Sequence, residues 1–147
     1  MIKHASVLAV SLLSMMAQAQ MSPVGLWRSI DDDTQQPKAE IRISQTANAG
    51  LSGVVERGLQ NNPNTDPNCN LCTDDRKGKP KIGMEIIRGG HQGDGKNVWE
   101  GGKILDPENG KNYSLRLTPI DGGKKLEVRG YIGAPLLGRT QTWIRVQ

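Results

Sequence analysis

Glycine recurs along this chain at the spacing of turns, and that spacing limits the possible folds more than any other feature. The 147 residues include 18 glycines and 8 prolines. Beyond the N-terminal segment, no stretch of helical length keeps an apolar period of about 3.6 residues without a glycine or proline interrupting it. The short segments in between alternate apolar and polar residues, which is typical of strands with one packed face. The sequence therefore predicts an all-β protein.

Turn dipeptides favour consecutive antiparallel strands. Asp94-Gly95, Asn109-Gly110 and Asp121-Gly122 tolerate the positive φ that tight hairpins require. About eight strands joined in this way can close into an antiparallel up-and-down barrel, with a β-sandwich as the alternative. Residues 82–88 would also suit a short helix. The expected strands are residues 24–30, 39–46, 51–57, 82–88, 97–105, 111–119, 124–132 and 139–146.

The N-terminus has the pattern of a cleavable signal peptide. A short basic start precedes an apolar run at residues 5–16, and Ala17 and Ala19 are small residues where a signal peptidase reads them. The run is shorter than the roughly 20 residues that span a bilayer, so a membrane anchor is the weaker interpretation. We expect cleavage after Ala19, a single domain over residues 20–147, and a periplasmic or secreted location.

A long segment at residues 58–81 interrupts the strand pattern and contains both cysteines, Cys69 and Cys72. Loops of this length without secondary structure are commonly functional or disordered. In an oxidising compartment, two cysteines three apart favour a disulfide that holds the loop. A redox-active dithiol is less favoured because no helix follows the motif. A zinc half-site is less favoured because no second cysteine pair exists. We expect no metal and no cofactor.

Other motifs have simpler interpretations. The formal net charge is +4, but acidic and basic residues are interleaved, so no nucleic-acid footprint is expected. Residues 90–97 nearly match a phosphate-binding loop, yet Asn97 replaces the required hydroxyl and a strand follows, so a hairpin turn is expected. His91 lies in this turn, where it is poorly placed for a Ser–His–Asp arrangement. Residues 31–33 are three aspartates, expected in a solvated turn rather than in a calcium site.

Several motifs resemble a known bacterial family. Gly25-Leu26-Trp27 on the first strand, with an arginine on the last, resembles the lipocalin signature. The ordered segments 69–72 (CNLC), 99–107 (WEGGKILDP), 109–113 (NGKNY), 128–133 (VRGYIG) and 137–145 (LGRTQTWIR) are similar to the exported bacterial proteins called domain of unknown function 2147. This resemblance implies a lipocalin-like barrel in the periplasm of a Gram-negative bacterium. The family has no established catalytic residues to transfer.

The leading functional hypothesis is a small-molecule binding module, because an eight-stranded barrel can hold one small ligand. Arginine on the expected ligand face favours an anionic or amphipathic ligand. Buried arginines need such a ligand or a carboxylate partner, and Glu100 and Glu127 are the carboxylates available nearby. Trp27 is expected to stack with Arg139 or Arg145. The alternatives are an envelope interaction or stress protein with a filled barrel, and an enzyme of unknown type. The candidate ligand-binding residues are Trp27, Trp99, Tyr113, Arg129, Tyr131, Arg139, Gln141, Trp143 and Arg145.

Overall fold

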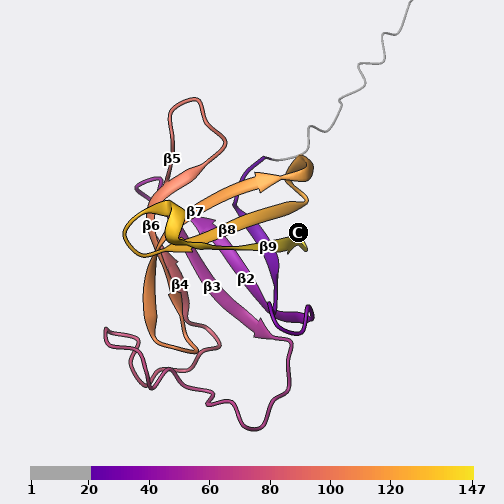
Figure 1. Cartoon of the computed structure of the whole chain (residues 1–147), viewed down its shortest axis with the longest axis vertical. Coiled ribbons are helices and arrows are strands. Elements are labelled where there is room, and N and C mark those ends of the chain that lie inside the picture. The colour runs from indigo at the N-terminus through magenta and orange to yellow at the C-terminus, as the bar shows by residue number, and fades with distance from the viewer. Residues whose placement is uncertain (1–20) are drawn as a thin grey trace, which may run out of the picture.

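The computed structural model describes residues 21–147, and the expected signal peptide at residues 1–19 lies outside them. Strands dominate this part of the chain, with two short 3-10 turns, η1 (Asp121–Gly123) and η2 (Pro135–Leu137) (Figure 1). The all-β prediction is confirmed. The strands are β1 (Gly25–Ile30), β2 (Pro37–Gln45), β3 (Leu51–Gly58), β4 (Glu85–Arg88), β5 (His91–Gln92), β6 (Trp99–Asp106), β7 (Lys111–Ile120), β8 (Lys125–Tyr131) and β9 (Arg139–Arg145).

Eight of these strands close into an antiparallel barrel. They follow the order β4-β3-β2-β1-β9-β8-β7-β6, and a further pairing of β4 with β6 completes the ring. This closing seam is short, since it has only the register pairs Ile87–Ile104 and Arg88–Lys103. The two-residue β5 pairs with β6 outside the ring. The predicted up-and-down barrel is therefore confirmed, and the β-sandwich alternative is wrong.

The largest difference from the expected strands is at residues 82–88. Only Glu85–Arg88 form a strand there, and the expected alternative of a helix is wrong. Residues 82 and 83 form a turn in which Gly83 has φ +86°, a left-handed conformation that favours glycine. The β3–β4 connection consequently extends beyond the expected loop and includes Met84, which is buried against the core.

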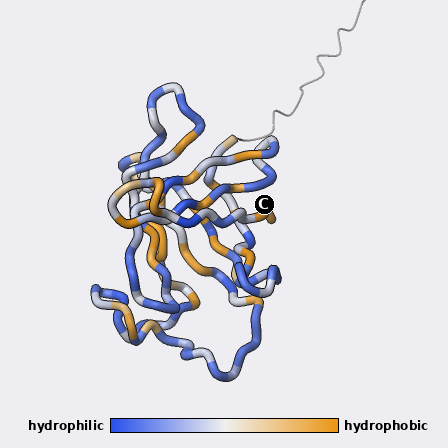
Figure 2. Tube along the Cα trace, in the orientation of Figure 1, coloured by the Kyte–Doolittle hydropathy of each residue, from blue (hydrophilic) through white to orange (hydrophobic). Residues whose placement is uncertain are grey.

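Alternation along the strands fills the inside of the barrel with apolar side chains. Trp27, Ile43, Leu117 and Leu126 are fully buried, and Trp143 is nearly so. Figure 2 shows hydrophobic segments along the strands and a mostly hydrophilic loop at the bottom of the molecule. Because these central side chains have no accessible surface, space for a ligand must lie toward the ends of the barrel.

The long β3–β4 loop is fixed to the barrel by its disulfide-bonded region. Cys69 and Cys72 are bonded to each other and buried, which confirms the expected disulfide. The side chain of Arg76 is also buried and donates hydrogen bonds to the carbonyl of Glu85 at 2.8 Å and the amide oxygen of Asn112 at 3.0 Å. Asp74 neutralises this guanidinium. The loop is therefore anchored to both β4 and β7.

Candidate functional site

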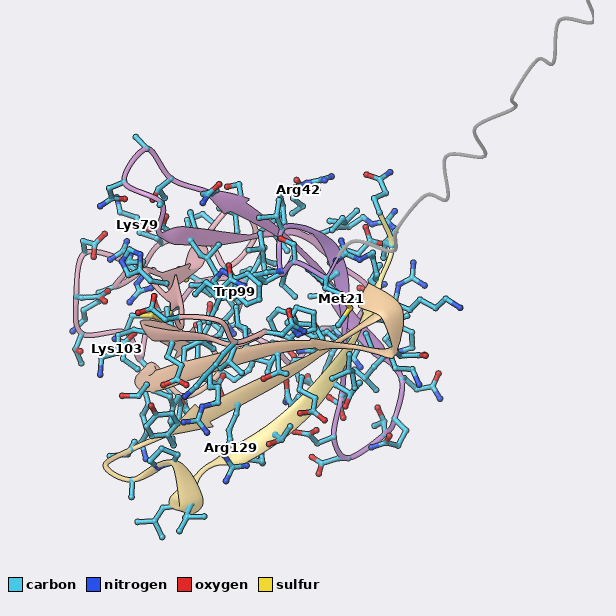
Figure 3. All side chains as sticks on the ribbon, turned by 90° about the horizontal axis from the view of Figure 1, so that it is seen from above. Met21, Arg42, Lys79, Trp99, Lys103 and Arg129 are labelled. Atoms are coloured by element: carbon cyan, nitrogen blue, oxygen red, sulfur yellow. A yellow bond between two sulfur atoms is a disulfide. The ribbon has the colours of Figure 1, made fainter. Side chains whose placement is uncertain are left out.

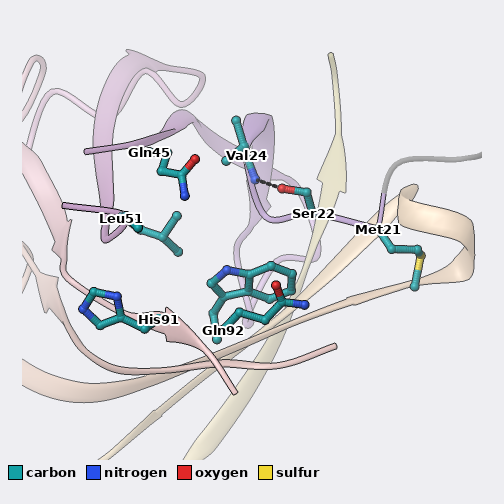
Figure 4. Close-up of a pocket in the computed structure, with 9 residues that line it drawn as sticks. Met21, Ser22, Val24, Gln45, Leu51, His91 and Gln92 are labelled. Carbon is teal, nitrogen blue, oxygen red and sulfur yellow. Dashed lines mark hydrogen bonds between the residues drawn. The ribbon is translucent and has the colours of Figure 1, made fainter. Parts of the chain in front are cut away.

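A cleft of about 510 Å³ opens at the end of the barrel where β1, β3 and β6 begin. We call it the mouth cleft. Figure 4 shows that its side chains come from the N-terminal segment, from the two strands of the β2–β3 hairpin and from β5, with Gln45 and Leu51 between Val24 and His91. The lining residues are Met21, Ser22, Val24, Gln45, Ala49, Leu51, His91, Gln92 and Trp99.

The mouth cleft combines apolar surface with uncharged polar groups. Leu51 is fully buried and Trp99 is partly buried against the core, so both form a firm apolar wall. The Gln45 side chain offers a donor and an acceptor, as does the ring of His91 when neutral. Among the described residues that line the cleft, none is Lys, Arg, Asp or Glu. This lining suits an uncharged molecule with an apolar part.

The hairpin of β5 and β6 forms one side of the mouth cleft. His91 pairs with Glu100 and Gln92 pairs with Trp99, so the expected hairpin turn at residues 90–97 is confirmed. The Gln92 side chain donates to the Lys96 carbonyl at 3.0 Å, which ties the turn together. The hairpin therefore places Trp99 and β5 on the same rim.

Trp27 and Arg145 lie beside the cleft and close the barrel end. The Arg145 guanidinium lies 4.2 Å from the Trp27 ring centroid, so the expected cation–π pair forms with Arg145 and not with Arg139. The Trp27 indole donates to the Pro23 carbonyl at 2.7 Å. Both predicted candidates therefore hold the N-terminal segment in place.

The guanidinium of Arg145 is fully engaged with backbone oxygen. It donates to the carbonyls of Gly123 at 2.5 Å, Val24 at 2.9 Å, Ser22 at 2.6 Å and Gln147 at 3.3 Å. Burial lowers the pKa of Arg145 from its ordinary value. Gly25 is required here, because a Cβ at that position would collide with the Arg145 side chain. The glycine and tryptophan of the Gly-x-Trp motif are thus explained by the arginine on β9.

Other predicted candidates lie toward the opposite end of the barrel. The Trp143 indole donates to Gln141 at 3.2 Å, and Gln141 donates to Asp32 at 2.8 Å. The Tyr113 hydroxyl accepts from the Asn109 side chain at 3.1 Å. These contacts link the buried Trp143 to the loops at that end. They do not bring Gln141 or Tyr113 to the mouth cleft.

The remaining candidates, Arg129, Tyr131 and Arg139, surround the β8–β9 loop. Figure 3 shows Trp99 among the strands and Arg129 beside this loop at the periphery. Arg129 donates to the Pro135 carbonyl at 2.8 Å and to the Thr140 hydroxyl at 2.7 Å. Arg139 is 73% exposed at its side chain and pairs with Asp32 at 2.9 Å. Glu100, one of the two glutamates expected to pair with arginines of the ligand face, pairs with Arg116.

Of the nine predicted candidates, Trp99 alone lines the mouth cleft in the described part of the chain. The other lining residues carry little signal in the sequence. Local pattern places His91 only in a turn, and the N-terminal residues Met21 and Ser22 precede the first expected strand. For Gln45 the sequence does carry a signal, because alternation along β2 places it on the same face of the strand as Ile41 and Ile43.

Residues 21–147 contain no group of three or more His, Cys, Asp or Glu placed to hold a metal ion. Asp31 instead accepts hydrogen bonds from the backbone of Asp33 and Thr34 in an exposed turn. No helix in the described segment is long and apolar enough to cross a membrane.

A solved structure supports the fold. Protein HP1028 from the human pathogen Helicobacter pylori, described as belonging to the lipocalin family, matches with a TM-score of 0.72. The match covers 87% of this chain and 85% of that chain, at 17% sequence identity. At this identity the similarity shows a lipocalin-like fold alone. No curated protein matches the chain.

A family profile covers nearly the whole barrel. It matches residues 25–145, from the start of β1 to the end of β9, and its description is "Uncharacterized protein conserved in bacteria (DUF2147)". The matched region includes Gly25, Trp27, the disulfide and Arg145, which the geometry explains as parts of one closed barrel. This chain therefore belongs to the bacterial family DUF2147 and has a lipocalin-like fold.

Proposed function

We propose that this protein binds a small molecule in the mouth cleft. The supporting observation is a cleft of about 510 Å³ with apolar and neutral polar side chains together. Small-molecule sites commonly measure about 300–1,000 Å³ and combine an apolar lining with a few polar groups. A lipocalin-like barrel is typically a binding fold, so the proposal includes no catalytic step.

The lining favours an uncharged amphipathic ligand. Its apolar part would pack against Trp99 and Leu51, while Gln45 and His91 would bond its polar groups. This differs from the anionic ligand suggested by the arginines. Arg145 is engaged by backbone carbonyls, and Arg129 lies by the β8–β9 loop. The lining of the cleft therefore supports an uncharged ligand more than those cations support an anionic one.

Native mass spectrometry of protein purified from its source, followed by calorimetry with the released molecule, tests this proposal. We expect a bound small molecule and about tenfold weaker binding for Gln45→Ala, because one hydrogen bond is lost. Gln60→Ala is the matched control, since Gln60 is exposed on the long loop. A ligand whose affinity is insensitive to Gln45→Ala and to Trp99→Leu would refute the mouth cleft as its site.

Trp99 provides a second measurement. Trp27 and Trp143 are buried, whereas Trp99 is partly exposed at the cleft. Ligand binding should therefore shift the tryptophan emission of the wild-type protein, and Trp99→Leu should abolish the shift. An unchanged shift in Trp99→Leu would place the ligand elsewhere.

We further propose that the chain is exported and cleaved after Ala19. The small residues at positions 17 and 19 support this, as does a disulfide of the kind that persists in oxidising compartments. Cell fractionation with N-terminal sequencing tests it, and Gln20 is the expected first residue. Ala19→Arg should block processing. A cytoplasmic protein that retains its first residues would contradict the proposal.

An interaction protein with a filled barrel is the second candidate function. The observation that favours it is the fully buried centre, where Trp27, Ile43 and Leu126 leave no accessible surface. Such a protein would work through its exterior, including the loop anchored by Arg76. This second function would be supported over small-molecule binding by two results together. The purified protein would carry no small ligand, and a crosslinked partner would be lost when this loop is replaced by a short linker.

A further inference from the structure

The β8–β9 loop exposes three large aliphatic side chains. Leu136 is 91% exposed, Leu137 is 78% exposed and Ile132 is 62% exposed. We call Ile132, Leu136 and Leu137 the apolar tip. Strand directions place the tip at the barrel end opposite the mouth cleft, because β8 starts near the cleft and runs away from it. The proposed small-molecule site does not account for these residues.

The loop is held in a defined shape, so the exposure of the tip is built into the fold. Arg129 donates to the Pro135 carbonyl at 2.8 Å and so braces η2 from β8. The η2 turn closes through hydrogen bonds from Leu137 to Ala134 at 3.0 Å and from Gly138 to Pro135 at 3.3 Å. A Cβ on Gly138 would lie 2.6 Å from the Gly130 carbonyl oxygen, so glycine is needed for the loop to pack this closely.

One basic side chain lies at the base of the apolar tip, and a second lies two strands away from Tyr131. Arg129 is at the base of the loop, and its side-chain bonds go to the uncharged acceptors Pro135 and Thr140. The register places Tyr131 opposite Ser114, and Ser114 opposite Lys103. Lys103 donates to the Ser114 hydroxyl, again an uncharged acceptor, at 3.0 Å. Arg129 therefore lies at the base of the tip and Lys103 lies two strands from Tyr131, and neither cation has a carboxylate among its hydrogen-bond partners in the described chain.

We infer that the apolar tip inserts into the surface of a lipid bilayer that contains anionic lipids. The aliphatic side chains would enter the boundary between headgroups and acyl chains, as the apolar faces of peripheral membrane proteins do. Arg129 and Lys103 would then face the lipid phosphates. Tyr131 directly precedes the tip and would lie at the interface, where tyrosine is enriched. The association is peripheral and reversible.

The size of the tip favours lipid over a protein partner. A stable protein interface takes about 20–30 residues from each side. The tip supplies three large apolar residues on one short loop, flanked by cations. That is too little surface for a specific protein contact of ordinary size. It is enough to enter a fluid surface that adapts its shape, and the adjacent positive charge is complementary to anionic headgroups.

Flotation of the purified protein with vesicles of phosphatidylethanolamine and phosphatidylglycerol tests the inference. We expect the protein to float with these vesicles. The double variant Leu136→Ser/Leu137→Ser should lower the partition coefficient about tenfold or more, because two aliphatic side chains lose their favourable transfer. The matched control is Leu71→Ser/Ile82→Ser, which changes two side chains on the β3–β4 loop that are 63% and 54% exposed. This control should float like the wild-type protein.

The charge contribution is tested separately. Lys103→Gln should weaken flotation and reduce its dependence on salt, whereas Lys79→Gln should change neither. Figure 3 shows Lys79 on the far side of the molecule from Arg129. Vesicles of phosphatidylcholine alone should bind the wild-type protein less well than those with phosphatidylglycerol.

Two outcomes would overturn the inference. The first is a wild-type protein that does not float, or that floats no better than Leu136→Ser/Leu137→Ser. The second is self-association in sedimentation velocity that the double variant abolishes, with no vesicle binding, since the tip would then contact a second copy. Circular dichroism should show the same fold in every variant, because each replaced side chain is exposed. Ile132→Ser provides an independent replacement on the same tip.

Discussion

At the scale of single residues, Arg145 joins more parts of the chain than any other side chain discussed above. Its guanidinium bonds carbonyls of the N-terminal segment, η1 and the C-terminal residue, and it stacks on Trp27. A lysine has the charge but not the planar fork of donors that these bonds use. Arg145 therefore holds the N-terminal segment, η1 and the C-terminal residue together at one end of the barrel.

Replacement of Arg145 should destabilise the protein. We expect Arg145→Ala to lower the free energy of unfolding by about 2–4 kcal/mol, because several carbonyls lose a charged donor. Arg145→Lys should fall between Arg145→Ala and the wild type. Urea denaturation followed by circular dichroism measures the difference. A loss below about 0.5 kcal/mol, the scale of an ordinary surface substitution, would show that these contacts are not needed for stability.

A second prediction about a single residue concerns Gly110. Its φ is +75°, and a Cβ there would collide with the carbonyl of Leu71 on the disulfide-bonded loop. Gly110→Ala should cost more than the roughly 1–3 kcal/mol of backbone strain alone, because the collision adds to that strain. Gly78→Ala is the matched control, because Gly78 has φ +72° and open space around its Cβ position. Equal losses of unfolding free energy in the two variants would show that loop packing contributes nothing at Gly110.

At the scale of elements, Glu40 links β1, β2 and β3 on the outside of the barrel. Its carboxylate accepts from Arg57 at 2.6 Å and from Arg28 at 3.2 Å. The hydrogen bond from Arg57, aided by Arg28, lowers the pKa of Glu40 below its ordinary value of 4.5 despite desolvation. A carboxyl group with a depressed pKa stabilises the folded state above its unfolded pKa, and that stabilisation is lost as the pH falls.

The unfolding free energy should therefore be nearly constant above about pH 5 and should fall below that value. Glu40→Gln should lower stability at neutral pH and make the acid side of the profile shallower. It should not flatten that side completely, because Asp75 also has a pKa lowered by its bond to Arg88. Urea titrations at a series of pH values measure both profiles. An unchanged acid slope in Glu40→Gln would show that the carboxylate of Glu40 contributes no pH-dependent stability.

Strands and hairpins could be predicted from sequence because their signals are local. Alternation and turn dipeptides such as Asn109-Gly110 and Asp121-Gly122 lie within the elements that they specify. The position of the β3–β4 loop could not be predicted from local sequence, because its anchor Arg76 bonds Asn112, which is far away along the chain. The same holds for the mouth cleft, where Gln45, His91 and Met21 meet only through the closed barrel. Of the three tryptophans predicted as walls of the ligand site, Trp99 lines the cleft whereas Trp27 and Trp143 are buried in the core, a difference that local sequence does not encode.

At the scale of the whole molecule, the barrel separates two surfaces with different chemistry. The mouth cleft is uncharged and lies where β1, β3 and β6 begin, and the apolar tip lies at the other end beside basic residues. The described core between them is solid. A molecule bound in the mouth cleft would therefore stay clear of the tip, so loss of ligand binding and loss of vesicle binding should be separable by mutation.

The seam between β4 and β6 is one of two short ladders in the closed barrel. It has two register pairs, as does the β1–β9 ladder, whereas the β2–β3 and β7–β8 ladders have seven each. Backbone hydrogen bonds from Val146 and Gln147 to the Leu26 carbonyl extend the β1–β9 contact beyond its ladder. Fewer paired residues at the seam imply a lower free energy of local opening there. Hydrogen–deuterium exchange should therefore show faster exchange for amides of β4 than for amides at the centres of β2 and β7.

Arg88→Gln should increase this difference, because Arg88 ties β4 to Asp75 and to Glu85 at its own start. Arg42→Gln is the matched control, since Arg42 makes an ion pair with Glu56 on the exterior of the β2–β3 ladder, away from the seam. If β4 exchanges as slowly as β2 in the wild-type protein, the barrel opens as one unit. The seam would then be held by the packing of Ile87, which is fully buried against Gly53, rather than by its few backbone hydrogen bonds.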